Sequence, residues 1–365
     1  MTTSTFLKTA LAFAVLHAPA CLFAQDIHFS QFNQSPLTLN PSLAGTTVWI
    51  RAAMQYRTQW RAVTDPYKTI GFTFDVKSKK RWIKIKNATA RYRQSSDNGF
   101  GWGVNFFHDK AGDGKMRTLQ ANLSAAYQIM MNRQSMVAVG FQGGVVQRSI
   151  HFNELIWGSQ YDVNSPTGYN TNLAPDMGIA AGDDHFIVPD LSAGGIYSYK
   201  RNERYMRGND QFDLTLGAAL FHVNRPKYSF LGTEEKLSPR MVIHGASIMG
   251  IKNTSLAVVP GFMFAHQGPN RELLVGGMVR YMLKEDSKYT GYIKAASVSA
   301  GGYYRNNDAF IATALYEFSS YAVGISYDFN VSGLKTVSSG RGGFEITLRF
   351  MNPSPFIYSR ASFNN

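Results

Sequence analysis

The clearest pattern in the chain lies in residues 48–61, which read VWIRAAMQYRTQWR. Apolar and aromatic side chains dominate the even positions, whereas the odd positions include Arg51, Arg57 and Arg61. Alternate side chains of a β-strand point to opposite faces, so this segment would have one apolar face and one strongly basic face. An Arg side chain at the lipid midplane costs about 2–4 kcal/mol. We therefore predict that the even face meets lipid and that the three arginines face a barrel lumen.

The same alternation recurs along the chain, with apolar stripes at 70–76, 100–106, 212–220 and 344–350. Soluble β-sandwiches also alternate, but they rarely sustain so many long strands with aromatic ends. Bacterial outer-membrane barrels have an even number of antiparallel strands. The sequence therefore predicts an all-β fold, a transmembrane antiparallel β-barrel of about 14 strands, near 48–61, 67–77, 99–109, 116–129, 135–148, 190–200, 211–222, 240–251, 254–266, 271–283, 289–305, 308–318, 320–330 and 341–351.

The N-terminus has the character of a signal peptide. A basic start precedes an apolar run at 10–16, and residues 22–24 (LFA) end in the small residue that a signal peptidase requires. We predict cleavage before Gln25, which leaves a mature chain without cysteine and so without disulfides or thiolate metal sites. The alternative is a lipoprotein anchored through Cys21, for which residues 18–20 (APA) form a poor lipobox.

The amino-acid composition limits the classes of protein to which the chain can belong. Charged residues make up 17% of the chain, below the roughly 25% of a soluble domain. No apolar run of about 18 residues follows the signal peptide, which excludes a helical membrane protein. The net charge of +13 does not by itself indicate nucleic-acid binding, and no nucleic-acid partner is predicted. Behind an export signal, the expected counterparts are outer-membrane lipid, lipopolysaccharide or an acidic protein.

Connection lengths predict the orientation of the barrel. Outer-membrane barrels have short periplasmic turns and long outer loops. With both ends of the barrel in the periplasm, the long connections at 149–189, 223–239 and 331–340 all fall outside. The short connections near 130–134, 252–254, 284–288 and 319 all fall on the periplasmic side.

One connection, residues 77–98, is long on the side where short turns are expected. It carries eight cations against the single acid Asp97. Charge runs are usually solvated, but a periplasmic segment of this sign could also dock an acidic partner. The candidate docking residues are Lys79, Lys80, Arg81, Lys84 and Lys86.

The sequence contains only weak matches to catalytic or metal-binding motifs. The chain has no HExxH, GxSxG or GxxxxGK[ST] motif. Residues 109–115 resemble a calcium loop only faintly, and a hairpin turn explains their Gly and Asp. His222, His244 and His266 lie near strand ends, where hydrogen-bonding roles are more common than metal binding. The lumenal arginines could bind an anionic solute, but pairing with lumenal acids or with a plug is favoured. We predict no enzyme: no catalytic residues, no cofactor and no metal site.

Two motifs carry a family resemblance: QDIHFSQFNQSPLTLNPSLAGT at 25–46 and YRTQW at 56–60. With FFHDKAGDGK, FHVNRP, YYRNNDA, ISYDFNVSGL and GRGGFEITLRF further on, the chain resembles the PorP/SprF family of type IX secretion system membrane proteins. The resemblance covers nearly the whole mature chain. Ser35 and Gly343 depart from the usual pattern.

The resemblance implies a protein of the Gram-negative outer membrane that serves cargo secretion or gliding motility. It implies contact with periplasmic ring or lipoprotein components of the machine, and with a secreted cargo or adhesin. A different function, a passive channel or uptake barrel for small or apolar solutes, is equally compatible with the alternation alone.

The expected organisation is a signal peptide at 1–24, a separate segment at 25–47, the barrel at 48–351 and a tail at 352–365. Residues 25–47 do not alternate and contain Pro36 and Pro41. Two arrangements are open for this segment. It could fold into the lumen, with Phe29, Phe32 and Leu37 packing and Gln31 and Asn40 bonding to lumenal groups, or it could form a periplasmic arm.

Overall fold

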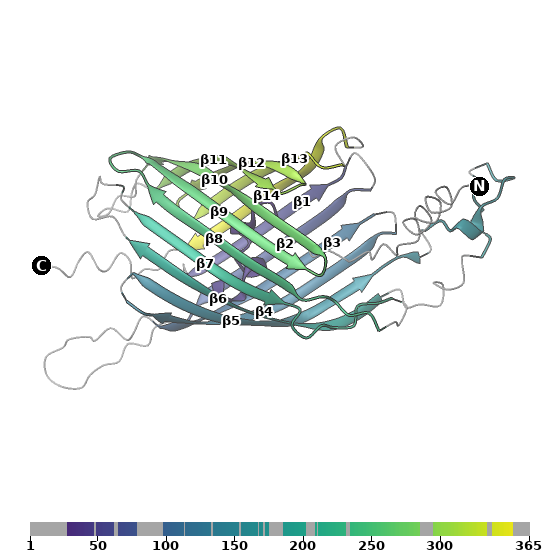
Figure 1. The fold of residues 1–365 in the computed structure, drawn as a ribbon, viewed down its shortest axis with the longest axis horizontal. Coiled ribbons are helices and arrows are strands. Elements are labelled where there is room, and N and C mark those ends of the chain that lie inside the picture. The colour runs from purple at the N-terminus through teal and green to yellow at the C-terminus, as the bar shows by residue number, and fades with distance from the viewer. Residues whose placement is uncertain are drawn as a thin grey trace, which may run out of the picture.

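The computed structural model describes residues 28–352, apart from gaps at 47–48, 62–64, 79–97, 113, 133, 153–154, 167, 171, 175–184, 202–208, 210, 231–233, 285–294 and 334–337. Within the described residues, the chain forms one closed barrel of antiparallel strands (Figure 1). The predicted signal peptide, the five candidate docking cations and residues 353–365 of the predicted tail lie outside the described residues.

Fourteen strands follow one another around the barrel, each paired with its neighbours in sequence, and the last closes onto the first. This confirms the predicted fold class and strand number. The strands are β1 (Ile50–Gln59), β2 (Tyr67–Lys77), β3 (Gly99–Ala111), β4 (Met116–Met130), β5 (Ser135–Ser149), β6 (His185–Arg201), β7 (Phe212–Phe221), β8 (Arg240–Gly250), β9 (Leu256–Gln267), β10 (Asn270–Lys284), β11 (Ala296–Arg305), β12 (Ala309–Phe318), β13 (Tyr321–Asn330) and β14 (Arg341–Asn352).

The two faces of the strands differ as the alternation predicts. In β14, Leu348 is 50% exposed on the outside, whereas its neighbour Thr347 is 1% exposed and faces inward. In β1, Met54 and Tyr56 are exposed, whereas Ala53 and Gln55 are buried. Exposed aliphatic and aromatic side chains thus cover the outer wall, where lipid replaces water as the contacting medium.

Strand β6 begins five residues earlier than the sequence predicted, at His185 and not at 190. The predicted strand, 190–200, began after Pro189, a residue that cannot donate a ladder hydrogen bond. Strand β7 pairs with β6 only from Ala193 onward, so Pro189 lies where β6 has a single strand neighbour, Val145 of β5 being its partner. An edge position of this kind tolerates proline.

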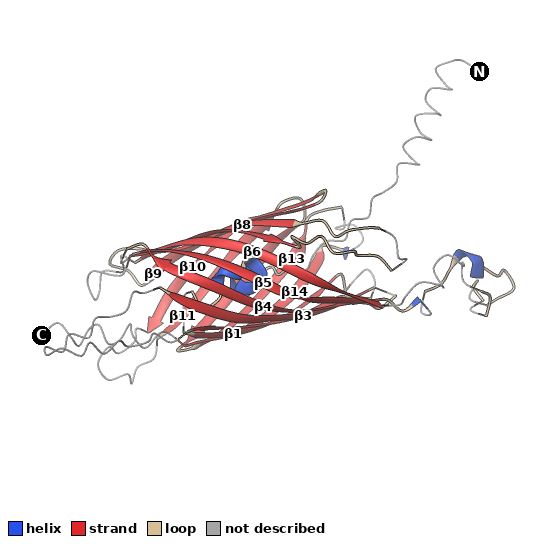
Figure 2. Cartoon of the chain, turned by 90° about the horizontal axis from the view of Figure 1, so that it is seen from below, coloured by secondary structure: helices blue, strands red, loops and turns tan. Residues whose placement is uncertain are grey.

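Residues 28–46, which we call the lumenal segment, lie inside the barrel (Figure 2). They form three short helical turns, η1 (Phe32–Gln34), α2 (Pro36–Leu39) and η2 (Pro41–Leu43). Proline occupies the first position of both α2 and η2, where its missing N–H has no helical acceptor to lose. None of the helices in the described residues is long and apolar enough to span a bilayer.

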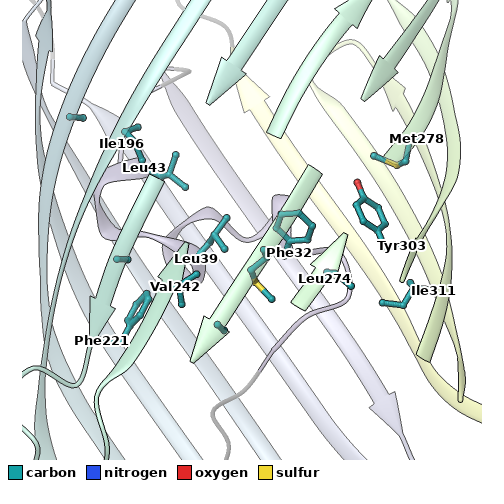
Figure 3. Packing of buried hydrophobic residues seen from close by; sticks show 14 of the residues in the cluster. Phe32, Leu39, Leu43, Ile196, Phe221, Val242, Leu274, Met278, Tyr303 and Ile311 are labelled. Atoms are coloured by element: carbon teal, nitrogen blue, oxygen red, sulfur yellow. The ribbon is translucent and has the colours of Figure 1, made fainter. Parts of the chain in front are cut away.

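The lumenal segment shares a hydrophobic core with the inner wall (Figure 3). Phe32, Leu39 and Leu43 pack among inward-pointing side chains of the wall, including Ile196, Phe221, Val242, Leu274, Tyr303 and Ile311. The rings of Phe32 and Tyr303 meet edge to face, with their centroids 5.8 Å apart. Each fully buried apolar side chain of this size contributes about 1.5–3 kcal/mol, so the core holds the segment in place.

Candidate functional site

The C-terminal end of the lumenal segment is held by a buried ion pair. Arg51 of β1 donates from Nε to Asp75 of β2 at 2.8 Å, and the Asp75 carboxylate also accepts the backbone N–H of Gly45 at 2.8 Å. An Nη atom of Arg51 donates to the carbonyl of Leu43 at 3.0 Å. Gln128 of β4 donates to the carbonyl of Gly45 at 2.7 Å. Arg51 and Asp75 therefore neutralise each other and bind the backbone of the segment at the same time.

The middle of the segment is fixed by Asn40, whose side chain is fully buried. Its amide nitrogen donates to the carbonyls of Gly195 and Ala218, each at 3.1 Å, and lies 3.2 Å from Nε2 of His244. Its amide oxygen accepts the N–H of Ser42 at 3.0 Å. One asparagine thus joins the η2 turn to strands β6, β7 and β8.

Close approach of this turn to the wall requires glycine at two positions. A Cβ on Gly101 of β3 would lie 1.9 Å from the carbonyl oxygen of Ala44. A Cβ on Gly140 of β5 would lie 2.5 Å from the Cα of Ser42. The wall is therefore shaped to accept the backbone of the lumenal segment at contact distance.

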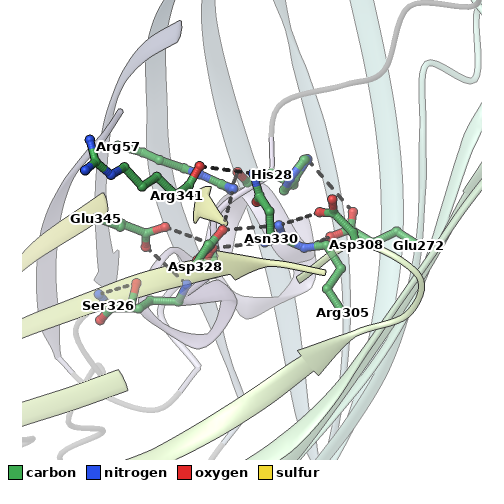
Figure 4. Close-up of polar contacts among 12 residues, drawn as sticks. His28, Arg57, Glu272, Arg305, Asp308, Ser326, Asp328, Asn330, Arg341 and Glu345 are labelled. Carbon is green, nitrogen blue, oxygen red and sulfur yellow. Dashed lines mark hydrogen bonds and ion pairs between the residues drawn. The ribbon is translucent and has the colours of Figure 1, made fainter. Parts of the chain in front are cut away.

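The N-terminal end of the lumenal segment is held by a network of charged groups (Figure 4). The N–H groups of Ser30 and Gln31 donate to the Glu345 carboxylate at 2.7 and 3.1 Å. The hydroxyl of Ser30 donates to Asp328 at 2.8 Å and accepts from Arg305 at 2.9 Å. These acids and the arginine come from β14, β13 and β11, so this end is tied to the closing side of the barrel.

Arg57 of β1 completes this network. One of its Nη atoms donates to the carbonyl of His28 at 2.5 Å, and the other to Asp328 at 2.9 Å. Arg305 also contacts Asp328 at 3.2 Å and Glu272 at 3.2 Å. Buried charges need partners of this kind, because each ion loses its hydration in the lumen.

Beyond this network, toward the long loops, lies a cavity of about 690 Å³, which we call the vestibule. His28 and Arg57 line it on the side of the lumenal segment. The remaining wall is mixed, with Asp109, Arg148 and Arg305 among the charged residues and Trp60, Tyr67, Phe107 and Tyr228 among the aromatic ones.

The structure places the three predicted lumenal arginines differently. Arg51 and Arg57 face inward, are buried and pair with acids, as described above. Arg61 does not join them: β1 ends at Gln59, and Arg61 lies beyond it in an exposed turn. The reversal follows Trp60, whose φ of 58° breaks the extended backbone and ends the alternation.

The three candidate histidines are separated and have different partners. Nδ1 of His222 lies 2.8 Å from Asp190, Nε2 of His244 faces Asn40, and Nδ1 of His266 lies 3.3 Å from the carbonyl of Asn270. Across the described ranges, no three His, Cys, Asp or Glu side chains gather in a way that could hold a metal ion. Strand β3 continues through residues 109–111, and β4 begins at Met116, directly after this stretch.

Asp75, Asp328, Arg305 and Glu272 also organise the site, although no sequence motif singles them out. Their signal was present in the alternation. Asp75 stands between the outward Phe74 and Val76, so its parity alone directs it to the lumen. A charged residue at a position whose parity matches the inner face is therefore the sequence signal for these acids and arginines.

With this geometry in view, comparisons with known proteins decide the family. A model of the family described as "Type IX secretion system membrane protein PorP/SprF" matches residues 22–350. The chain belongs to this PorP/SprF family. The resemblance seen in the sequence is thereby confirmed, and as a PorP/SprF barrel the protein resides in the outer membrane of a Gram-negative bacterium.

Among solved structures, the barrel is similar to the toluene transporter TbuX of Ralstonia pickettii, with 10% identity, coverage of 87% of this chain and 93% of that chain, and a TM-score of 0.43. It is similar to the translocator domain of the autotransporter NalP from Neisseria meningitidis, with 8% identity, coverage of 94% and 96%, and a TM-score of 0.33. It is also similar to BamA of Haemophilus ducreyi, with 9% identity, coverage of 83% and 70%, and a TM-score of 0.39. A sequence search of curated proteins gave no match.

Proposed function

We propose that the chain is a non-enzymatic component of the type IX secretion system, a sealed barrel that docks periplasmic components of the machine or its cargo. Membership of the PorP/SprF family supports the general role. The occupied lumen is the observation that supports a sealed docking barrel. Residues 28–46 pack and hydrogen-bond against the inner wall from the Asp75 ion pair to the network around Asp328.

A passive channel would need a continuous polar path through the barrel. Here the lumenal segment is tied to opposite parts of the wall, by Asn40 to β6 and β7 and by Ser30 and Gln31 to β13 and β14. Its apolar side chains enter a dry core with the wall. This packing favours a docking scaffold over a solute channel.

Conductance in planar bilayers tests the sealed state. We expect the purified native protein to insert without steady current steps. A variant that lacks residues 28–46 should give stable single-channel steps, because removal of the segment leaves the lumen to water. Steady steps from the native protein of the same size as those of the deletion variant would contradict the proposal.

The basic connection between β2 and β3 is our proposed docking element. Its composition supports this role, with eight cations against the single acid Asp97 at 77–98. Such a contact would be mainly electrostatic and would weaken with salt, since the Debye length is about 8–10 Å near physiological ionic strength. Its partner would present an acidic face on the periplasmic side.

Five substitutions test this element. Changing Lys79, Lys80, Arg81, Lys84 and Lys86 to Gln should lower co-purification of periplasmic partners and secretion of cargo, while the heat-modifiable barrel stays intact. The matched control removes five cations from the opposite end of the barrel: Lys110, Lys115, Arg225, Lys227 and Lys236. If partner recovery and secretion stayed at native levels in the first variant, the connection would be a spacer.

A further inference from the structure

The vestibule has features of a ligand site that docking and sealing do not use. Its volume of about 690 Å³ falls within the 300–1,000 Å³ that is common for small-molecule sites. It lies at the end of the barrel from which the long β5–β6 and β7–β8 connections leave, and the lumenal segment closes it on the other side. A ligand could therefore enter from outside the cell without crossing the membrane.

Arg57 contributes a buried donor that lacks an acceptor. Its side chain lines the vestibule and the residue is only 2% exposed. Both Nη atoms have partners, the carbonyl of His28 and the carboxylate of Asp328. Its Nε has no acceptor among the described residues. A buried guanidinium N–H that is left without an acceptor is energetically unfavourable. This Nε has almost no accessible surface, however, so the contact with a ligand in the vestibule falls to Arg148.

Arg148 of β5 contributes a second donor group and lacks an acidic partner among the described residues. One of its Nη atoms contacts the sulfur of Met116 at 2.9 Å, and its Nε is buried without an acceptor. Its guanidinium carbon lies 4.8 Å from the ring centre of Tyr228 and 5.8 Å from that of Phe230. Aromatic rings orient a guanidinium and leave its edge available for a bidentate anion.

The acids of the vestibule are already engaged. Asp109 accepts a hydrogen bond from Thr69 at 2.6 Å. Asp308 pairs with Arg305 at 3.0 Å, and Asp328 binds both Arg57 and Arg305. Glu272, the fourth acid that lines the vestibule, pairs with Arg305 at 3.2 Å. Arg148 is left without an acidic partner among the described residues, and an acceptor such as a carboxylate complements it.

The rest of the wall offers apolar contact. Trp60 and Tyr67 meet edge to face, with ring centres 4.7 Å apart, and both line the vestibule together with Phe107. Pockets that orient a ligand commonly combine an aromatic wall with a few polar groups. The ligand should therefore carry an apolar or aromatic body beside its anionic group.

We propose that the vestibule binds an organic carboxylate with an aromatic or apolar body, up to the size of a short peptide, through the guanidinium of Arg148. This goes beyond the proposed docking function. A free organic acid and the C-terminal end of a peptide both supply this chemistry, and the experiment separates the two sources.

Isothermal titration calorimetry on the purified full-length protein in detergent tests the proposal with three probes. These are 3-phenylpropionate, N-acetyl-Ala-Phe with a free carboxylate, and the same peptide as its C-terminal amide. We expect the carboxylate probes to bind and the amide to bind at least tenfold more weakly. A tighter peptide acid would point to a chain terminus as the natural ligand, and a tighter phenylpropionate to a free acid.

The variant Arg148→Gln should raise the Kd for the acids at least tenfold, because it removes the charge and keeps a side chain of similar length. Arg117→Gln is the matched control, since Arg117 lies at the same end of the barrel but on the exposed outer face of β4. Heat modifiability reports whether each variant folds. Absence of binding by both acids at millimolar concentration, equal binding of acid and amide, or an unchanged Kd in Arg148→Gln would each overturn the proposal. Bilayer conductance is measured separately, so failure here leaves the sealed-barrel proposal untouched.

Discussion

At the scale of single residues, the Arg51–Asp75 ion pair links the barrel wall to the lumenal segment. Asp75 is fully buried and accepts from both Arg51 and Gly45. Removing one partner of a buried pair leaves an uncompensated charge, at a cost of about 3–5 kcal/mol.

Asp75→Asn should lower the free energy of unfolding by that amount, measured by urea unfolding in lipid vesicles with tryptophan fluorescence. Asp162→Asn, in the long connection between β5 and β6, should change it by less than about 0.5 kcal/mol. Equal effects of the two substitutions would show that the pair does not hold the segment.

A second residue-scale prediction concerns the lipid face. Leu348 is outward-facing in the middle of β14, so Leu348→Arg should destabilise the folded barrel by about 2–4 kcal/mol. Tyr321, 63% exposed, is also outward-facing but lies at the end of β13, where the cost of an Arg falls to about 0–1 kcal/mol. Unfolding of Leu348→Arg and Tyr321→Arg in urea with lipid vesicles compares the two. A larger loss for Tyr321→Arg would mean that the apolar band is placed wrongly along the barrel axis.

At the scale of elements, the lumenal segment depends on the shape of the wall. A side chain at Gly140 would collide with the backbone of Ser42, whereas a Cβ on Gly143 of the same strand meets only Leu191 at 3.4 Å. Gly140→Val should therefore displace the segment and produce current steps in planar bilayers, with the barrel still heat-modifiable. Gly143→Val, whose side chain would lie on the outer face of the barrel, should produce no current steps. If both variants were silent and folded, the segment would tolerate a shifted position and its seal would not depend on this contact.

The strands and the lumenal segment differ in how much of them the sequence predicts. The two faces of a strand meet different environments, so its residue types alternate between apolar and polar. The bounds predicted for β2 from this alternation are those of the structure, 67–77. The lumenal segment has no such period, because its environment is set by β3, β5 and β6, far away in sequence. Its packing residues Phe29, Phe32 and Leu37 could be chosen from the sequence, as could Gln31 and Asn40 as hydrogen-bonding residues. Whether they packed in a lumen or in a periplasmic arm could not.

The candidate site follows the same division. The parity of β1 predicted that Arg51 and Arg57 face the lumen, but not which acids they meet, since Asp328 is 271 residues away from Arg57. Arg61 shows the limit of the pattern. In the sequence, the alternation of residue types continues through Arg61, whereas the strand ends at Gln59 and the chain turns at Trp60. The residue at which the backbone reverses depends on how the strand pairs with the next strand. The periodicity of the sequence contains no information about that pairing.

At the scale of the whole molecule, the barrel has two unlike ends. The connection between β5 and β6 is long, whereas that between β8 and β9 is only a short turn at 251–255, and the two leave opposite ends of the barrel. Long loops lie outside the cell in outer-membrane barrels. The vestibule, which opens among the long connections, would then face the exterior, and the Arg51–Asp75 end would face the periplasm.

Cysteine labelling in whole cells tests this orientation. The sequence has one cysteine, Cys21, in the predicted signal peptide, so an introduced cysteine would be the sole thiol of a mature chain that begins at Gln25. Asn164 and Lys252 are both exposed, in the long β5–β6 connection and the short β8–β9 turn. Asn164→Cys should react with a membrane-impermeant maleimide in intact cells, and Lys252→Cys should react only after the outer membrane is permeabilised. Labelling of Lys252→Cys alone in intact cells would invert the barrel. It would also move the vestibule to the periplasmic side, where its ligand would have to come from inside the envelope.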